Sequence, residues 1–260
     1  MSVRLDCPAP GVRRLLIDRP DKRNAIDHAV RQAMIENLLA ARRDPSCRAI
    51  VLGGVGGVFS AGGDIASMAA LDAAGARERM QHIHQLCRLL ESLPLPVVAA
   101  VEGFCAGAGV GMALLADVIV ASPASKFLFP FMRLGLAPDW GTLRTLPARI
   151  GVAAAKGMLV HGKVIDGADA LRSGLVDELA EGDVMAAAIQ RALYLAGLPQ
   201  DAFARMKSRL IHPAASFAEE LQREEDDQAV LLLGSDFREG FAAFAEKREP
   251  RFGDRAEQPL

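Results

Sequence analysis

The sequence predicts an α/β fold in which short buried strands alternate with helices, followed by a C-terminal part made of helices alone. Apolar runs at residues 12–17, 49–52 and 97–101 have the length and composition of buried strands. Each run leads through a turn to a segment with helical periodicity, which is the order typical of α/β proteins. From Asp183 onward the pattern is helical throughout. We therefore expect a core over residues 1–200 and a helical region over residues 201–260.

Turn and capping signals place the elements of the first half. Arg19-Pro20-Asp21 ends the first strand, and Asp27 is a suitable N-cap for the helix that follows. Pro94 and Pro96 end a later helix, because proline has no N–H for an intrahelical hydrogen bond. The elements expected here are strands at 12–17 and 49–52, a variable helical region at 67–79 and a helix at 80–93.

The second half contains more helix and fewer strands. Asp166 or Asp169 can cap a short helix. Ser216 and Glu219 form a capping box before a charged amphipathic helix, and Asp236 opens the last helix. The remaining expected elements are a central strand at 97–101, short strands at 118–121 and 127–129, and a helix at 142–150.

Composition excludes several classes of protein. The chain has 260 residues, of which 51% are hydrophobic, and a net charge of −2 with scattered positive residues, so no nucleic-acid partner is expected. No apolar run approaches the roughly 20 residues that span a bilayer, and charged residues interrupt any signal-peptide core. The four cysteines lack CxxC spacing and nearby histidine clusters, which predicts reduced thiols in a cytoplasmic protein and no metal site.

Two glycine-rich turns carry the strongest functional signal. The strand at 97–101 leads into Cys105-Ala106-Gly107-Ala108-Gly109, and residues 58–65 (VFSAGGDI) form a second such turn before a helix. Unpaired N–H groups at a helix start stabilise negative charge, such as a phosphate or the oxyanion of a reacting carbonyl. One such turn can be a tight corner in a core. Two of them, each directly after a strand, indicate a site built from both.

These segments, in their order and spacing, resemble the crotonase family, also called the enoyl-CoA hydratase/isomerase family. The resemblance covers nearly the whole chain. It implies a spiral of ββα repeats and a helical C-terminal region that forms a homotrimer or a dimer of trimers. It also implies an acyl-CoA thioester as substrate, with coenzyme A as part of that substrate and no other cofactor. The segments that carry it are Asp18-Arg19-Pro20, Arg23-Asn24-Ala25, residues 59–65, 96–117, 135–151, 174–177 and 239–248.

The resemblance also assigns site residues by motif position. The backbone amides of Gly63 and Ala108 would hold the thioester oxygen between them, where preorganised donors stabilise the negative charge of an enolate. The resemblance places Lys247 near coenzyme A, and the alternative is that it is a solvated cation in the last turn of a helix. The residues expected to contact coenzyme A are Arg23, Asn24, Ala25, Ala61, Ile65, Phe244 and Lys247, with Phe244 and Lys247 often supplied by a neighbouring subunit.

The catalytic positions depart from those of typical hydratases. The two glutamates that activate water in such enzymes fall at Gly111 and Phe131, neither of which can move a proton. Asp139 remains, at a motif position where several isomerases of the family place their working aspartate. One carboxylate is enough to remove a proton at one carbon and return it two carbons away. The alternative is that Asp139 caps the helix beginning near Trp140.

Other functions stay open at this point. The same scaffold supports a hydratase, a hydrolase or an aromatic acyl-CoA dehalogenase, and loss of both glutamates also fits a non-catalytic CoA-binding subunit. A serine peptidase on a related spiral would need partners for Ser60 or Ser125, and the sequence identifies none. We interpret His82 and His84 as surface or packing residues.

Overall fold

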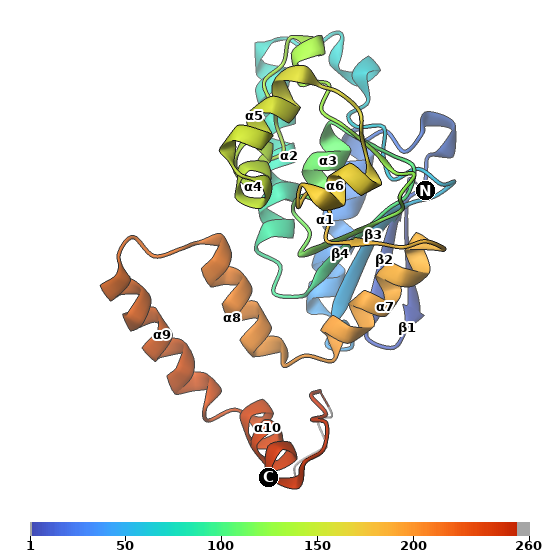
Figure 1. Ribbon diagram of the computed structural model, residues 1–260. Coiled ribbons are helices and arrows are strands. Elements are labelled where there is room, and N and C mark those ends of the chain that lie inside the picture. Colours follow the sequence, from blue (N-terminus) through green and yellow to red (C-terminus); the bar gives the residue numbers. More distant parts are fainter. Residues whose placement is uncertain (1, 254–260) are drawn as a thin grey trace.

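A six-stranded sheet forms the centre of the molecule in the computed structural model, which describes residues 2–253 (Figure 1). Its strands lie in the order β1-β2-β3-β4-β6-β9, with β1 antiparallel to β2 and the remaining pairs parallel. A second, three-stranded sheet has the order β5-β7-β8. The strands are β1 (Val3–Ala9), β2 (Val12–Ile17), β3 (Ala49–Gly54), β4 (Val97–Val101), β5 (Phe104–Ala106), β6 (Val118–Ala121), β7 (Lys126–Leu128), β8 (Ile165–Asp166) and β9 (Glu178–Leu179).

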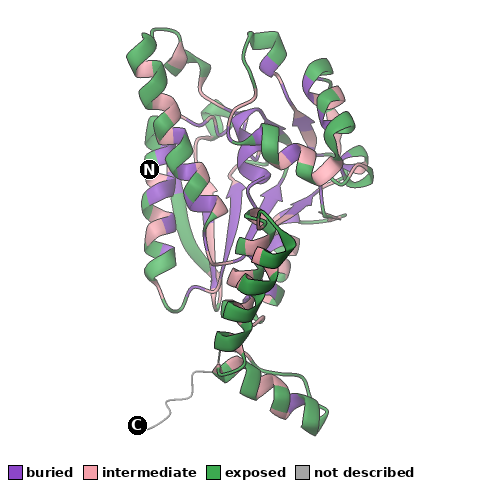
Figure 2. Ribbon diagram, turned by 90° about the vertical axis from the view of Figure 1, so that its left-hand side faces the viewer, coloured by how far each residue is buried: buried purple, intermediate pink, exposed green. Residues whose placement is uncertain are grey.

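Helices cover both faces of the large sheet. Alternate residues of a strand point to opposite faces, so Ile50 and Leu52 join the core beneath α1 and α2, whereas Val51 joins the core beneath α7. All five residues of β4 are buried, as expected for a parallel strand covered on both sides (Figure 2). The helices are α1 (His28–Arg43), α2 (Ala73–Glu91), α3 (Ala108–Ala113), α4 (Thr142–Ile150), α5 (Val152–His161), α6 (Gly167–Arg172), α7 (Val184–Ala196), α8 (Gln200–Ile211), α9 (Phe217–Leu231) and α10 (Ser235–Glu246), with short 3-10 turns at Pro20–Lys22, Ile65–Met68 and Phe131–Leu134.

The predicted α/β class is confirmed, with differences at some elements. Asp27 and Asp166 cap α1 and α6 through their side chains as expected. The edge strand β1 was not predicted, because four of its seven residues are exposed and it lacks a regular alternation of apolar residues. Helix α2 begins at Ala73 rather than residue 80, capped by Asp72. The last helix starts at Ser235 with Gly234 as N-cap, so the prediction that Asp236 opens it is wrong by one residue.

The C-terminal helices project from the body of the molecule (Figure 1). Helix α8 begins at Gln200, next to the predicted boundary between residues 1–200 and 201–260. That division stays a prediction, and its end residues, 1 and 254–260, lie outside the described part of the chain. Among residues 2–253, no helix is long and apolar enough to cross a membrane.

A buried ion pair ties α8 to the sheet. Lys207 Nζ lies 2.8 Å from Asp117 Oδ2 and 3.3 Å from the carbonyl oxygen of Leu95, and the lysine is only 5% exposed. The same carboxylate oxygen accepts a hydrogen bond from Val97 N at the start of β4. The pair therefore joins the helical region to the central strand.

Replacing Lys207 by methionine should lower the free energy of unfolding by about 3 kcal/mol, because a partly buried carboxylate would lose its counter-charge. Urea denaturation followed by circular dichroism measures the change. Lys156→Met, at an exposed position of α5, is the control and should leave the transition unchanged. Equal midpoints for the two variants would show that the pair contributes nothing.

Candidate active site

The two glycine-rich turns lie side by side, as expected if both contribute to one site. A parallel bridge joins Ser60 to Cys105, with Ser60 N donating to Phe104 O at 3.0 Å and Ala106 N donating to Ser60 O at 3.0 Å. A Cβ atom on Gly62 would lie 2.7 Å from Ala106 O, closer than real Cβ contacts, and the φ of Gly62 is +100°. Only glycine fits this position without strain.

Two unpaired backbone donors meet at this junction. Ala108 is the first residue of α3, so its N–H has no partner inside the helix. Gly63 bridges to Ile26, but the hydrogen bonds of that bridge run through Gly62 O and Asp64 N. Within residues 2–253 neither the Gly63 nor the Ala108 N–H donates a hydrogen bond. Both donors are therefore free, as an oxyanion hole would require.

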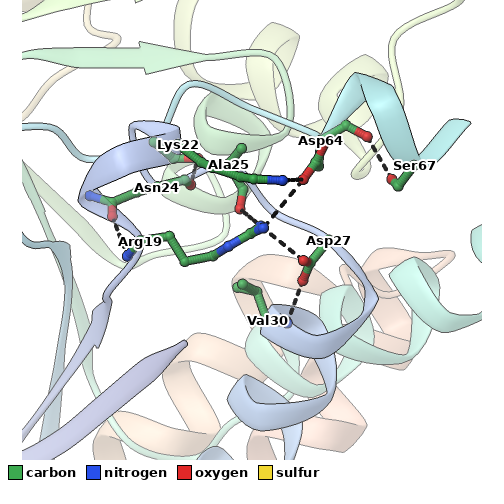
Figure 3. A network of polar contacts seen from close by, with 9 residues as sticks. Arg19, Lys22, Asn24, Ala25, Asp27, Val30, Asp64 and Ser67 are labelled. Carbon is green, nitrogen blue, oxygen red and sulfur yellow. Dashed lines mark hydrogen bonds and ion pairs between the residues drawn. The ribbon is translucent and has the colours of Figure 1, made fainter. Parts of the chain in front are cut away.

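A network of charges holds the turn at residues 58–65 in place (Figure 3). The Arg19 guanidinium donates to Ala25 O at 2.7 Å and pairs with Asp27 at 2.9 Å and with Asp64 at 3.3 Å. Lys22 also pairs with Asp64 at 3.3 Å, and hydrogen bonds from both cations lower the pKa of this carboxyl against the effect of burial. Asp64 thus orders the loop directly after Gly63.

The predicted coenzyme A segment is packed against the same turn. Arg23 is exposed in a left-handed conformation, and its carbonyl oxygen accepts from Ala61 N at 2.9 Å. Ile65 is 60% exposed. The structure therefore gathers Arg23, Asn24, Ala25, Ala61 and Ile65, while their contact with coenzyme A stays a prediction.

Asn24 is fully buried and has a structural role. Its amide donates to Val55 O at 2.9 Å and to Val58 O at 2.6 Å. Figure 3 shows that its side-chain carbonyl oxygen accepts from Arg19 N. With both ends of the side chain engaged, any coenzyme A contact at this position falls to the neighbouring backbone and side chains.

Phe244 and Lys247 lie far from this cluster within the chain. Both are exposed on or directly after α10, at the other end of the molecule from the two turns (Figure 1). Lys247 is the C-cap of α10 in a left-handed conformation. One chain therefore does not bring these two residues to the site, and a role there requires a neighbouring subunit.

Asp139 does not cap the following helix. Helix α4 has Gly141 as its N-cap and no side-chain capping bond, and only the main-chain oxygen of Asp139 accepts from Thr142 N. The Oδ1 atom of Asp139 is buried without a hydrogen-bond partner among the described residues. Burial raises the pKa of Asp139, opposed mainly by the positive charge of Arg79 on α2. The helix-cap alternative is wrong.

The position of the first missing glutamate is occupied by a tryptophan ring. A Cβ atom on Gly111 would lie 2.4 Å from Trp140 Cβ and 3.2 Å from Thr142 Oγ1. Trp140 is 1% exposed with φ of +54°, an unusual conformation for a bulky residue. Phe131, at the second glutamate position, is also buried. Neither position carries a carboxylate that could activate water.

Sequence reasoning missed Arg79 and assigned no role to Trp140. Arg79 precedes Ile83, Leu86 and Leu90 on the buried stripe of α2, and this spacing of an arginine with apolar residues was the available signal. One Nη atom of Arg79 lies 3.2 Å from the position of a Cβ atom on Gly63.

The remaining candidates have structural roles. His82 stacks on His28 with ring centroids 4.2 Å apart and accepts from Arg31 Nε, so its interpretation as a packing residue is confirmed. Ser60 Oγ and Ser125 Oγ donate to the main-chain oxygens of Asn24 and Val101. Neither hydroxyl is free to act as a nucleophile.

Comparison with known proteins agrees with this geometry. A family described as "Enoyl-CoA hydratase/isomerase" matches residues 9–255. The chain belongs to the enoyl-CoA hydratase/isomerase family. Among its relatives, a probable enoyl-CoA hydratase of Rhodobacter capsulatus is 38% identical over 94% of this chain and 95% of that protein. The 1,2-epoxyphenylacetyl-CoA isomerase of Escherichia coli is 32% identical over 93% and 95%.

Solved structures show that this family member has the crotonase fold. A putative enoyl-CoA hydratase from Streptomyces coelicolor superimposes with a TM-score of 0.91 at 34% identity, covering 96% of this chain and 94% of the other. A putative enoyl-CoA hydratase/isomerase from Mycobacterium abscessus has a TM-score of 0.89 at 35% identity, covering 96% and 98%. The predicted family and the predicted spiral fold are therefore both confirmed.

Gly111→Ala should destabilise the protein by about 1–3 kcal/mol, because the added methyl group overlaps Trp140 Cβ. Gly157→Ala, in the interior of α5 where nothing lies within 4 Å, should stabilise it by about 0.5–1 kcal/mol through helix propensity. Thermal denaturation of the two variants provides the comparison. A Gly111→Ala protein as stable as Gly157→Ala would mean that Trp140 moves away freely.

Proposed function

We propose that this protein is an enoyl-CoA isomerase in which Asp139 moves a proton between two carbons of the acyl chain. The observation that carries this proposal is the Asp139 carboxylate, which has a buried oxygen without a hydrogen-bond partner among the described residues, while the Gly63 and Ala108 N–H groups are free. Burial raises the pKa of this carboxyl, which suits a base that must also return its proton.

The proposed reaction balances with residues of this chain alone. Asp139 removes a proton from the carbon between the thioester and the double bond, and the electron pair of that C–H bond moves into a conjugated dienolate. The Gly63 and Ala108 amides stabilise the charge that develops on the thioester oxygen. Asp139 then returns the proton two carbons away, and the double bond shifts into conjugation.

Hydration is the second candidate, because relatives carry both kinds of name. The 2,3-dehydroadipyl-CoA hydratase of Escherichia coli is 32% identical to this chain, as is the isomerase named above. Gly111 and Phe131 argue against water activation by paired carboxylates. Incubating the protein with 2-enoyl-CoA and 3-enoyl-CoA substrates separates the two, since only a hydratase forms a 3-hydroxyacyl product.

We also propose that the helical region forms the predicted trimer. Apolar side chains line a groove across α8, α9 and α10 and remain exposed in the single chain, which is typical of a surface that another subunit covers. Exposed residues on this region include Leu233, Phe237, Phe241 and Phe244. In such an assembly Phe244 and Lys247 would complete the coenzyme A site of a neighbour.

Asp139→Asn should lower kcat for isomerisation of a 3-enoyl-CoA by on the order of 10²–10⁴, because the amide cannot carry the proton. Acyl-CoA binding, measured by calorimetry, should remain. Glu102→Gln, at an exposed carboxylate next to the central strand, is the control and should keep full activity. Undiminished turnover by Asp139→Asn would favour a different catalytic group, and turnover by neither protein would favour a non-catalytic CoA-binding subunit.

The pH dependence follows from the same carboxyl. Asp139 must be ionised to accept the proton, so kcat/KM should fall as pH drops through its raised pKa, at a pH above the ordinary value of about 3.9. A raised native pKa also means that the native state binds more protons than the unfolded state between the two pKa values. Stability therefore falls as pH rises through that window, and Asp139→Asn should be at least as stable as the wild type at pH 7. An acid limb at the ordinary aspartate pKa would contradict this.

A further inference from the structure

Arg79 is a cation that lies on the buried stripe of α2 and next to Gly63, whose N–H is one of the two proposed oxyanion donors. Its guanidinium lies against Gly63, with Nη2 3.2 Å from the position of a Cβ atom there. The residue is half-buried, yet it makes no hydrogen bond and no ion pair with any residue between 2 and 253. Without a protein partner, its N–H donors are available to an anionic ligand.

The charges around Arg79 indicate which ligand. Asp139 and Asp64 are the carboxylates that attract it, and Arg31 is a nearby like charge. Asp64 is already paired with Arg19 and Lys22, whereas Asp139 has a buried oxygen without a partner. Arg79 and Asp139 therefore attract one another without forming an ion pair, and Arg79 lies next to Gly63, one of the two residues with a free amide.

We propose that Arg79 is a catalytic residue that contacts the thioester enolate and stabilises its negative charge together with the Gly63 and Ala108 amides. The inference rests on the proposed function and adds a charged group to it. When Asp139 takes the proton, its negative charge passes to the thioester oxygen, and the same cation then faces the new charge. The net charge of the site therefore stays constant along the reaction, and the Arg79 cation stabilises the enolate as it forms.

The test compares Arg79→Met and Arg79→Lys with Arg77→Met, an exposed arginine two residues earlier on α2. With 3-hexenoyl-CoA, whose acyl chain is uncharged, Arg79→Met should lower kcat by on the order of 10²–10³ with little change in KM. Arg79→Lys should keep part of the rate, and Arg77→Met all of it. Thermal denaturation checks folding, and Arg79→Gln replaces the methionine variant if that one does not fold.

A second readout does not depend on turnover. Acetoacetyl-CoA absorbs in the near ultraviolet when it binds as its enolate, so the wild type should show this band and Arg79→Met should lose it. The acid limb of kcat/KM should also move to higher pH in Arg79→Met. The groups of α2 that interact with Asp139 are Arg79, His84 and Cys87. Because the Arg79 charge opposes the effect of burial, removing it should raise the pKa of Asp139 further.

Two outcomes would overturn this role. A kcat for Arg79→Met equal to that of the wild type on the uncharged chain, with the enolate band intact, would leave Arg79 without a catalytic function. A loss confined to KM and to acyl groups that end in a carboxylate would make Arg79 a binding group for anionic substrates. An active Asp139→Asn protein would instead contradict the proposed function, while the acetoacetyl-CoA band would still report on Arg79.

Discussion

The site depends on the close main-chain contact between the turn after β3 and the turn after β4. The bridge between Ser60 and Cys105 fixes the two turns in register, and Gly62 allows the backbones to approach as they do. Since the hydrogen bonds of that contact use other groups, the Gly63 and Ala108 N–H groups are left free. Backbone donors held in this way need no reorganisation when charge develops, which is why they suit enolate chemistry.

Charged residues surround the turns on two sides, and they are paired on one side and unpaired on the other. Arg19, Lys22 and Asp64 neutralise each other on the side of α1, and the Asn24 side chain satisfies three main-chain groups. On the side of α2 and α4, Arg79 and Asp139 have no such partners. The paired charges order the loop, and the unpaired charges are the ones to which we assign catalytic roles.

Sequence predicted the elements with strong local signals and the turns that carry glycine. The strand at 97–101 and the caps Asp27 and Asp166 follow from apolar runs and capping residues, which act locally. Strand β1 is held by pairing with β2, so its own composition predicts little. Arg79 reaches the site only because α2 crosses beside Gly63, a tertiary contact that no local pattern encodes. Phe244 and Lys247 are exposed on or directly after α10, and a role for them at the site would need a neighbouring subunit.

The absence of a glutamate at position 111 is built into the packing of this protein. Trp140 is held in a left-handed conformation with its Cβ atom where a side chain at 111 would begin. A glutamate could enter only if Trp140 moved, and Trp140 directly follows Asp139. The position without the acid is thus packed against the residue that follows the remaining carboxylate. Burial also raises the pKa of the Asp139 carboxyl, and the buried Trp140 directly follows it, so position 111 and the remaining carboxylate belong to one packed region.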